Sequence, residues 1–122
     1  MKTKNVMKFC DEEDGCFPVA DFLCNLDVKT RARAMSTISL LKDNGINLYS
    51  PFVEEKIFGD DLQALDIPMD DGGTIVIPFF LDIWPGDVLE IILTHAFIRN
   101  GSENPQAEIL RAQRLINEFL DS

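Results

Sequence analysis

The chain has 122 residues, of which 46% are hydrophobic and 26% are charged, and its formal net charge at pH 7 is -10. This length predicts one domain, residues 1–122, with a core that needs no disulfide or metal. The excess of acids disfavours direct nucleic-acid binding, because lysine and arginine contacts to phosphate supply most of the affinity in such complexes. No apolar run could span a membrane and acids stand where a signal peptide is apolar, so we expect a soluble, cytoplasmic protein.

The first half of the chain predicts a strand followed by a helical hairpin. The segment KNVMKF, residues 4–9, is typical of an edge strand, and an acidic turn follows at residues 11–15. Pro18 suits the first turn of a helix whose apolar residues recur at helical spacing: Val19, Phe22, Leu23 and Leu26. A second helix is expected from Val28 to Asn44, ended by Gly45, with three residues facing the core: Ala34, Ile38 and Leu41.

The second half predicts three antiparallel strands and a closing helix. The strands LQALDI (62–67), TIVIPFF (74–80) and VLEIILTHAFI (88–98) are separated by the turns MDDGG and DIWPGD and form a meander. Pro78 removes a ladder donor and implies an edge or a bulge. Asn104 and Pro105 suit the start of a helix with an apolar stripe that docks on the sheet: Ile109, Ala112, Leu115, Ile116, Phe119 and Leu120. The whole is an α+β layer fold.

The cysteines and acidic turns predict neither a metal site nor a cofactor site. Cys10, Cys16 and Cys24 are odd in number and match neither zinc spacing nor a disulfide framework, so we expect free thiols that are buried or half-buried. The acidic runs DEEDG and MDDGG lack the ligand spacing of a calcium-binding EF-hand loop. Turn formation is the favoured interpretation of both runs.

The segment from Val19 to Phe119 resembles the RelE/HigB toxin superfamily, in particular its phage-derived, HigB-like branch. Its residues VADFLCNLDVKTRARAMSTISLLKDNGINLYSPFVEEKIFGDDLQALDI are followed by IILTHAFIRN and NPQAEILRAQRLINEF. The positions in register form a framework: Leu40, Leu41, Asn44, Gly45, Pro51, Gly59, Leu62, Leu65, His95, Phe97, Pro105, Glu108, Ile109 and Ala112. This resemblance implies a toxin of a type II toxin-antitoxin system that binds the ribosome and cuts messenger RNA.

The chain departs from that family at the positions that the resemblance assigns to RNA cleavage. Such cleavage needs cations to stabilise the charge on phosphorus and a group that transfers protons. Where the resemblance implies sheet arginines, the chain has Asp66 and Val76, and Phe79 replaces an aromatic hydroxyl. Of two expected lysines after the last strand, one is matched by Arg99 and the other is Asn100.

His95 and Arg99 are the candidate catalytic residues, each with a structural alternative. His95 is the single histidine and would alternate with Leu93 and Phe97 on one face of a strand, either as a hydrogen-bonded core residue or as a proton-transfer group. Arg99 would bind phosphate or be an ordinary surface residue. Asn100 and Asn104 suit turn and cap geometry, and a solvated helix face is the favoured interpretation of the basic cluster Lys29, Arg31 and Arg33.

Two functional hypotheses follow. The first is an active, ribosome-dependent endoribonuclease toxin. The second is a toxin homologue with lost or weakened cleavage that binds a protein, such as its cognate antitoxin or another basic protein, or that acts as an acidic mimic of nucleic acid. The second hypothesis places the protein-binding face at Asp66 and Val76, and exposure of Val76 would also permit a homodimer.

Overall fold

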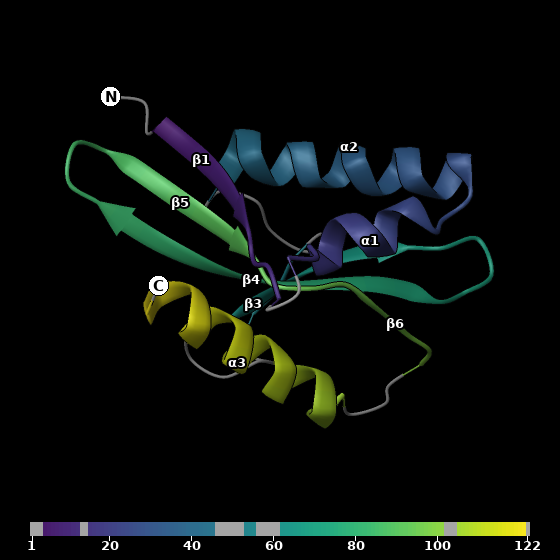
Figure 1. Ribbon diagram of the computed structural model, residues 1–122. Helices are drawn as coiled ribbons and strands as arrows, with labels where there is room; N and C mark the ends of the chain where they lie inside the picture. Colours follow the sequence, from purple (N-terminus) through teal and green to yellow (C-terminus); the bar gives the residue numbers. More distant parts are fainter. Residues whose placement is uncertain (1–3, 13–14, 46–52, 56–61, 102–104, 122) are drawn as a thin grey trace.

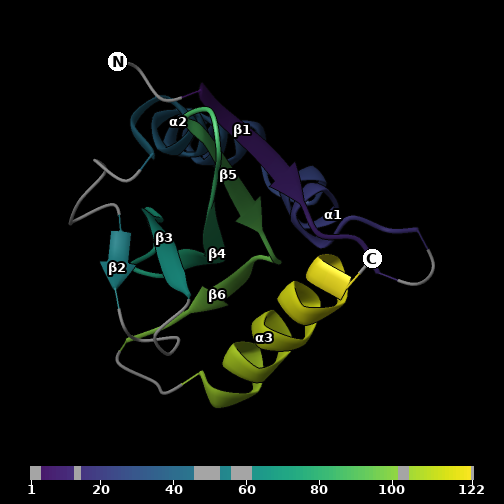
Figure 2. The ribbon, with the colours of Figure 1, turned by 90° about the vertical axis from the view of Figure 1, so that its left-hand side faces the viewer.

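A six-stranded sheet lies between two helical layers in the computed structural model, which describes residues 4–12, 15–45, 53–55, 62–101 and 105–121. Helices α1 and α2 cover one face of the sheet and α3 crosses the other (Figures 1 and 2). The elements in chain order are β1 (Lys4–Phe9), α1 (Pro18–Cys24), α2 (Val28–Asn44), β2 (Val53–Glu55), β3 (Gln63–Pro68), β4 (Thr74–Trp84), β5 (Val88–Leu93), β6 (Phe97–Arg99) and α3 (Gln106–Asp121). The predicted α+β class is confirmed.

The strand order is β1-β5-β4-β3-β2, with β6 paired to β4, and it differs from the predicted meander. Strands β3, β4 and β5 pair antiparallel in sequence order, as predicted. However, β1 joins the sheet parallel to β5, and β2 extends it beyond β3. The expected last strand is also divided into β5 and β6. A meander is therefore only the centre of a mixed sheet, and β1 is an edge strand as predicted.

Local signals set the bounds of α2. Its predicted core residues Ala34, Ile38 and Leu41 are buried against the sheet. Gly45 ends the helix with φ +54, where a side chain is strained, and a Cβ added there would come within 2.8 Å of Leu89 Cδ2. Glycine is therefore favoured at this stop for its backbone conformation, and a side chain there would also displace the end of the Leu89 side chain of β5.

The basic cluster at the start of α2 has structural partners and is solvated in part, as expected, since the Lys29 side chain is 76% exposed. The Arg31 guanidinium donates hydrogen bonds of 2.8–3.0 Å to the carbonyl oxygens of Leu23, Cys24 and Leu26. These bonds satisfy carbonyl groups at the end of α1, which a helix leaves without intrahelical donors. Lys29 and Arg33 pair with the Asp70 carboxylate at 3.5 and 3.1 Å, and these cations hold the pKa of that carboxyl below its usual value.

The sheet divides the buried apolar residues into two cores. The core beneath α1 and α2 is built on inward residues of every long strand, including Ile67, Ile77 and Ile91. The core beneath α3 confirms most of the predicted stripe, since Ile109, Ala112, Leu115 and Ile116 are buried in it, whereas Leu120 is 48% exposed. Because the sheet is covered on both faces, strands β3, β4 and β5 carry near-continuous apolar runs.

A bulge interrupts the pairing of β4 with the last two strands. Phe79 pairs with Leu93 and Val76 with Phe97, so residues 77–78 lie opposite residues 94–96. The Pro78 carbonyl accepts hydrogen bonds from both the backbone N–H and the hydroxyl of Thr94, each at 3.0 Å, but Pro78 offers no N–H in return. Pro78 predicts either an edge strand or a bulge, and the bulge is confirmed.

Candidate functional site

His95 lies in this bulge, fully buried beneath α3. Its Nδ1 is 3.2 Å from the Thr94 hydroxyl oxygen, and its ring stacks on Phe97 with centroids 5.5 Å apart. Leu93 points into the core beneath α1 and α2, and Phe97 points into the core beneath α3. The expectation that His95 alternates with both on one face is therefore wrong, because the extra residue of a bulge shifts the alternation of side chains.

The His95 ring is neutral at neutral pH. Burial lowers the pKa of His95 from 6.5 to about 4, and the positive charges of Arg111 and Arg114 act in the same direction. The Glu12 carboxylate acts in the opposite direction, but desolvation of the charged ring outweighs its attraction. The Glu108 carboxylate lies 3.5 Å from Nε2, which makes no hydrogen bond. With no exposed surface, the ring has no direct contact with an external substrate.

Asp66 and Val76 are brought together, but they do not form an open binding face. The two residues pair directly across β3 and β4, and Val76 pairs in turn with Phe97 of β6. Val76 is 0% exposed and Asp66 is 9% exposed, because the stripe of α3 packs on this face of the sheet. The predicted protein-binding face and the exposure of Val76 that would support a homodimer are therefore both wrong.

Arg99 ends β6 and is half-buried, opposite Thr74 of β4. It lies at the same end of the sheet as the bulge, two residues beyond Phe97, on which the His95 ring stacks. Asn100 is exposed in the turn that follows, near Gly73. Asn104, the expected N-cap of α3, falls outside the described residues.

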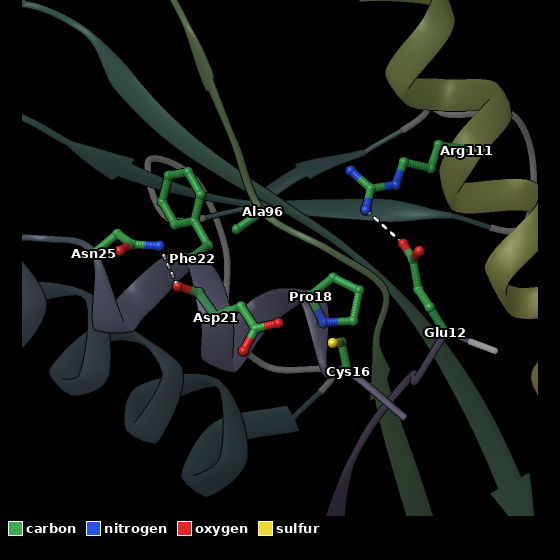
Figure 3. Close-up of a pocket in the computed structure, with 8 residues that line it drawn as sticks. All are labelled: Glu12, Cys16, Pro18, Asp21, Phe22, Asn25, Ala96 and Arg111. Carbon is green, nitrogen blue, oxygen red and sulfur yellow. Dashed lines mark hydrogen bonds and ion pairs between the residues drawn. The ribbon is translucent and has the colours of Figure 1, made fainter. Parts of the chain in front are cut away.

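A cleft of about 370 Å³ opens beside the buried histidine and is the candidate site that the structure adds. It is lined by residues of α1, α3, the loop after β1 and the bulge: Glu12, Cys16, Pro18, Asp21, Phe22, Asn25, Ala96 and Arg111. Figure 3 shows Arg111 reaching from α3 to Glu12, while Asp21 and Phe22 project from α1 and Asn25 directly follows its last residue. A pocket of this size accommodates a small molecule or a protein side chain.

Hydrogen bonds and one ion pair hold the walls of the cleft. Arg111 Nη2 donates to Glu12 Oε1 at 2.5 Å, which ties α3 to the loop after β1. The backbone N–H of Glu12 donates to the Cys16 carbonyl at 2.8 Å, and Asn25 Nδ2 donates to the Asp21 carbonyl at 3.0 Å. Sequence reasoning missed this site because its walls come from both ends of the chain, with no local motif that unites them.

Comparison with protein-family models, with curated proteins and with solved structures finds no match to this chain. The described residues contain no helix long and apolar enough to cross a membrane. The same ranges contain no group of three or more histidine, cysteine or acidic side chains that could hold a metal ion.

The three cysteines form no disulfide, but only Cys10 is buried as expected, whereas Cys16 and Cys24 are exposed. Burial, followed by the charges of Asp11 and Glu118, raises the pKa of the Cys10 thiol to about 12.

We expect a disulfide reagent such as dithionitrobenzoate to modify Cys16 and Cys24 rapidly and Cys10 only after unfolding, since the thiolate is the reactive form. In a Cys10→Ala variant, the slow reaction that follows unfolding should be absent. Equally fast reaction of all three thiols in the folded protein would contradict the burial of Cys10.

Proposed function

We propose that the chain is a RelE/HigB-like toxin homologue in which messenger RNA cleavage is lost or weakened, and that it acts by binding another protein. One observation carries the proposal. The sheet positions that the resemblance assigns to arginines hold an acid and an aliphatic residue, Asp66 and Val76, and both lie beneath α3. RNA binding would require an accessible cationic face, because phosphate contacts dominate its affinity.

The state of the candidate catalytic groups supports the same proposal. General acid-base catalysis needs a titratable group within reach of the substrate. His95 is buried and has a lowered pKa, and Phe79 has no hydroxyl to donate. Arg99 alone keeps an expected cationic position, and one cation provides little stabilisation for a phosphorane-like transition state.

Charge and exposed apolar residues support a protein partner. The net charge of -10 favours a basic partner, for which the cognate antitoxin is the first candidate. Ile83 and Trp84, at the end of β4, are 74% and 51% exposed, and tryptophan is among the residues enriched at protein interfaces. The strong negative charge also supports a second candidate function, an acidic mimic that occupies the nucleic-acid groove of a basic protein.

Expression in bacteria tests the loss of cleavage. We expect no growth arrest on induction, intact messenger RNA in a ribosomal translation reaction, and no binding of single-stranded RNA at low salt. An Arg99→Ala variant should behave like the parent, as should the control Arg114→Ala, whose arginine is exposed on α3. Growth arrest that Arg99→Ala relieves and Arg114→Ala does not would establish the active endoribonuclease instead.

A further inference from the structure

The cleft lies where the chain diverges from two parallel strands. β1 and β5 run parallel, so their carboxyl ends meet at the same end of the sheet. From β1 the chain passes to α1 on one face, and from β5 it passes through β6 to α3 on the other face (Figure 2). Such a divergence leaves a crevice outside the carboxyl ends of parallel strands, which is where open sheets bind ligands. Glu12, Ala96 and Arg111 line the cleft from these diverging segments.

The charges that line the cleft favour a cation. Glu12 and Asp21 contribute two carboxylates and Arg111 one guanidinium, so the sum is one negative charge (-2 + 1 = -1). Arg111 already donates to Glu12, whereas Asp21 is exposed at the start of α1. A cleft concentrates the field of its lining charges, and the net charge of the whole chain has the same sign.

The uncharged lining residues favour a flat cation on an apolar stem. The Phe22 ring is half-buried and lies between Asn25 and Ala96 in Figure 3, whereas the Asp21 carboxylate points toward Pro18. Pro18 and Ala96 add apolar surface. The Asn25 amide nitrogen already donates to the Asp21 carbonyl, so its Oδ1 is the atom that can accept from a ligand. A guanidinium group donates two parallel hydrogen bonds to a carboxylate and is more weakly hydrated than an ammonium group.

We propose that this cleft binds an arginine side chain presented by a basic protein partner. Asp21 accepts hydrogen bonds from the guanidinium, and the apolar lining residues Pro18, Phe22 and Ala96 contact the aliphatic stem. An arginine side chain fits within a volume of about 370 Å³. The inference rests on the proposed function, since it names the chemistry by which a basic partner is recognised.

Titration of the isotopically labelled protein with capped amino acids, followed by nuclear magnetic resonance, tests the site. N-acetyl-arginine amide should shift the backbone signals of Phe22, Asn25 and Ala96. The lysine analogue should bind more weakly, and the citrulline analogue, which has the shape of arginine without its charge, should not bind. Asp21→Asn should weaken binding of the arginine probe about tenfold, the effect of losing a charge-assisted hydrogen-bonded pair.

The matched control is Asp43→Asn, which removes the same charge from an exposed position near the end of α2, next to the Gly45 stop. Binding should be unchanged in this variant. If both substitutions weakened binding of the arginine probe equally, the binding would reflect only the overall negative charge of the protein, and the inference would be overturned. The absence of signal shifts at millimolar probe would also overturn it. Tighter binding of free arginine than of an arginine-containing peptide would overturn the protein partner in favour of a small molecule.

The outcomes separate this inference from the proposed function. Messenger RNA cleavage together with Asp21-dependent binding of the probe would refute the proposed function and leave the arginine site standing. Absence of both cleavage and probe binding would leave the proposed function standing and refute the arginine site. Because Asp21 is exposed, its replacement by asparagine should leave the spectrum of the folded protein well dispersed.

Discussion

Replacing Val76 with aspartate is expected to unfold the protein or to lower its free energy of unfolding by at least about 3 kcal/mol. Val76 is completely buried in the core between the sheet and α3, where it packs with Phe97 and Ala112. A carboxylate at this position would lose its hydration without gaining a cation. Urea denaturation followed by circular dichroism measures the change.

The control for this substitution is Ile83→Asp in the same strand. Ile83 is 74% exposed, so the introduced charge stays in water and the free energy of unfolding should change by no more than about 0.5 kcal/mol. If Val76→Asp were tolerated as well as Ile83→Asp, then α3 would not cover this face of the sheet. The sheet face would in that case be open to a partner, as the sequence predicted.

Acidification from pH 7 to pH 5 is expected to lower the free energy of unfolding by about 2 kcal/mol through His95 alone. The unfolded chain takes up a proton near the ordinary pKa of 6.5, whereas folded His95, with a pKa of about 4, stays neutral. Stability from this group is therefore full above pH 6.5 and declines as the pH falls through this window. The carboxyls of Asp27 and Asp70, whose pKa values are lowered from 3.8, titrate below it.

A His95→Gln variant isolates this contribution. Glutamine does not titrate, so the variant should show a flatter dependence of unfolding free energy on pH between 7 and 5, whatever its stability at pH 7. Nuclear magnetic resonance of the parent should also find the imidazole neutral at pH 6. Identical pH dependence in the two proteins, or a folded-state pKa near 6.5, would mean that the ring contacts water.

The helices are the most predictable part of the fold because their signals are local. Pro18 marks the start of α1, and Gly45 marks the end of α2 at the residue where the structure ends it. The stripe of α3 is equally clear, since Ile109, Ala112 and Leu115 share one side of a helix at any position in the fold. Such patterns depend on neighbours within a few residues and need no knowledge of the tertiary structure.

The pairing of distant segments is the part that the sequence did not reveal. The apolar stripe of α3 could pack on either face of a sheet, and Val76 is buried because α3 packs on its face. The parallel pairing of Lys4 with Val88 leaves no periodic signal in either segment. The cleft depends on both, because the Glu12–Arg111 contact joins residues that are 99 positions apart. The bulge at His95 likewise follows from Pro78 only once the pairing is known.

The parallel pairing of β1 with β5 also bears on how the chain folds during synthesis. β1, α1 and α2 are translated first, yet the strands that cover their apolar faces include β4 and β5, and β1 gains its partner only when Val88–Leu93 are present. Contacts between such distant residues raise the contact order and slow folding, because a long loop must close before they form. The nascent chain therefore keeps much of its apolar surface uncovered until β5 has left the ribosome, and the first core can close only at that stage.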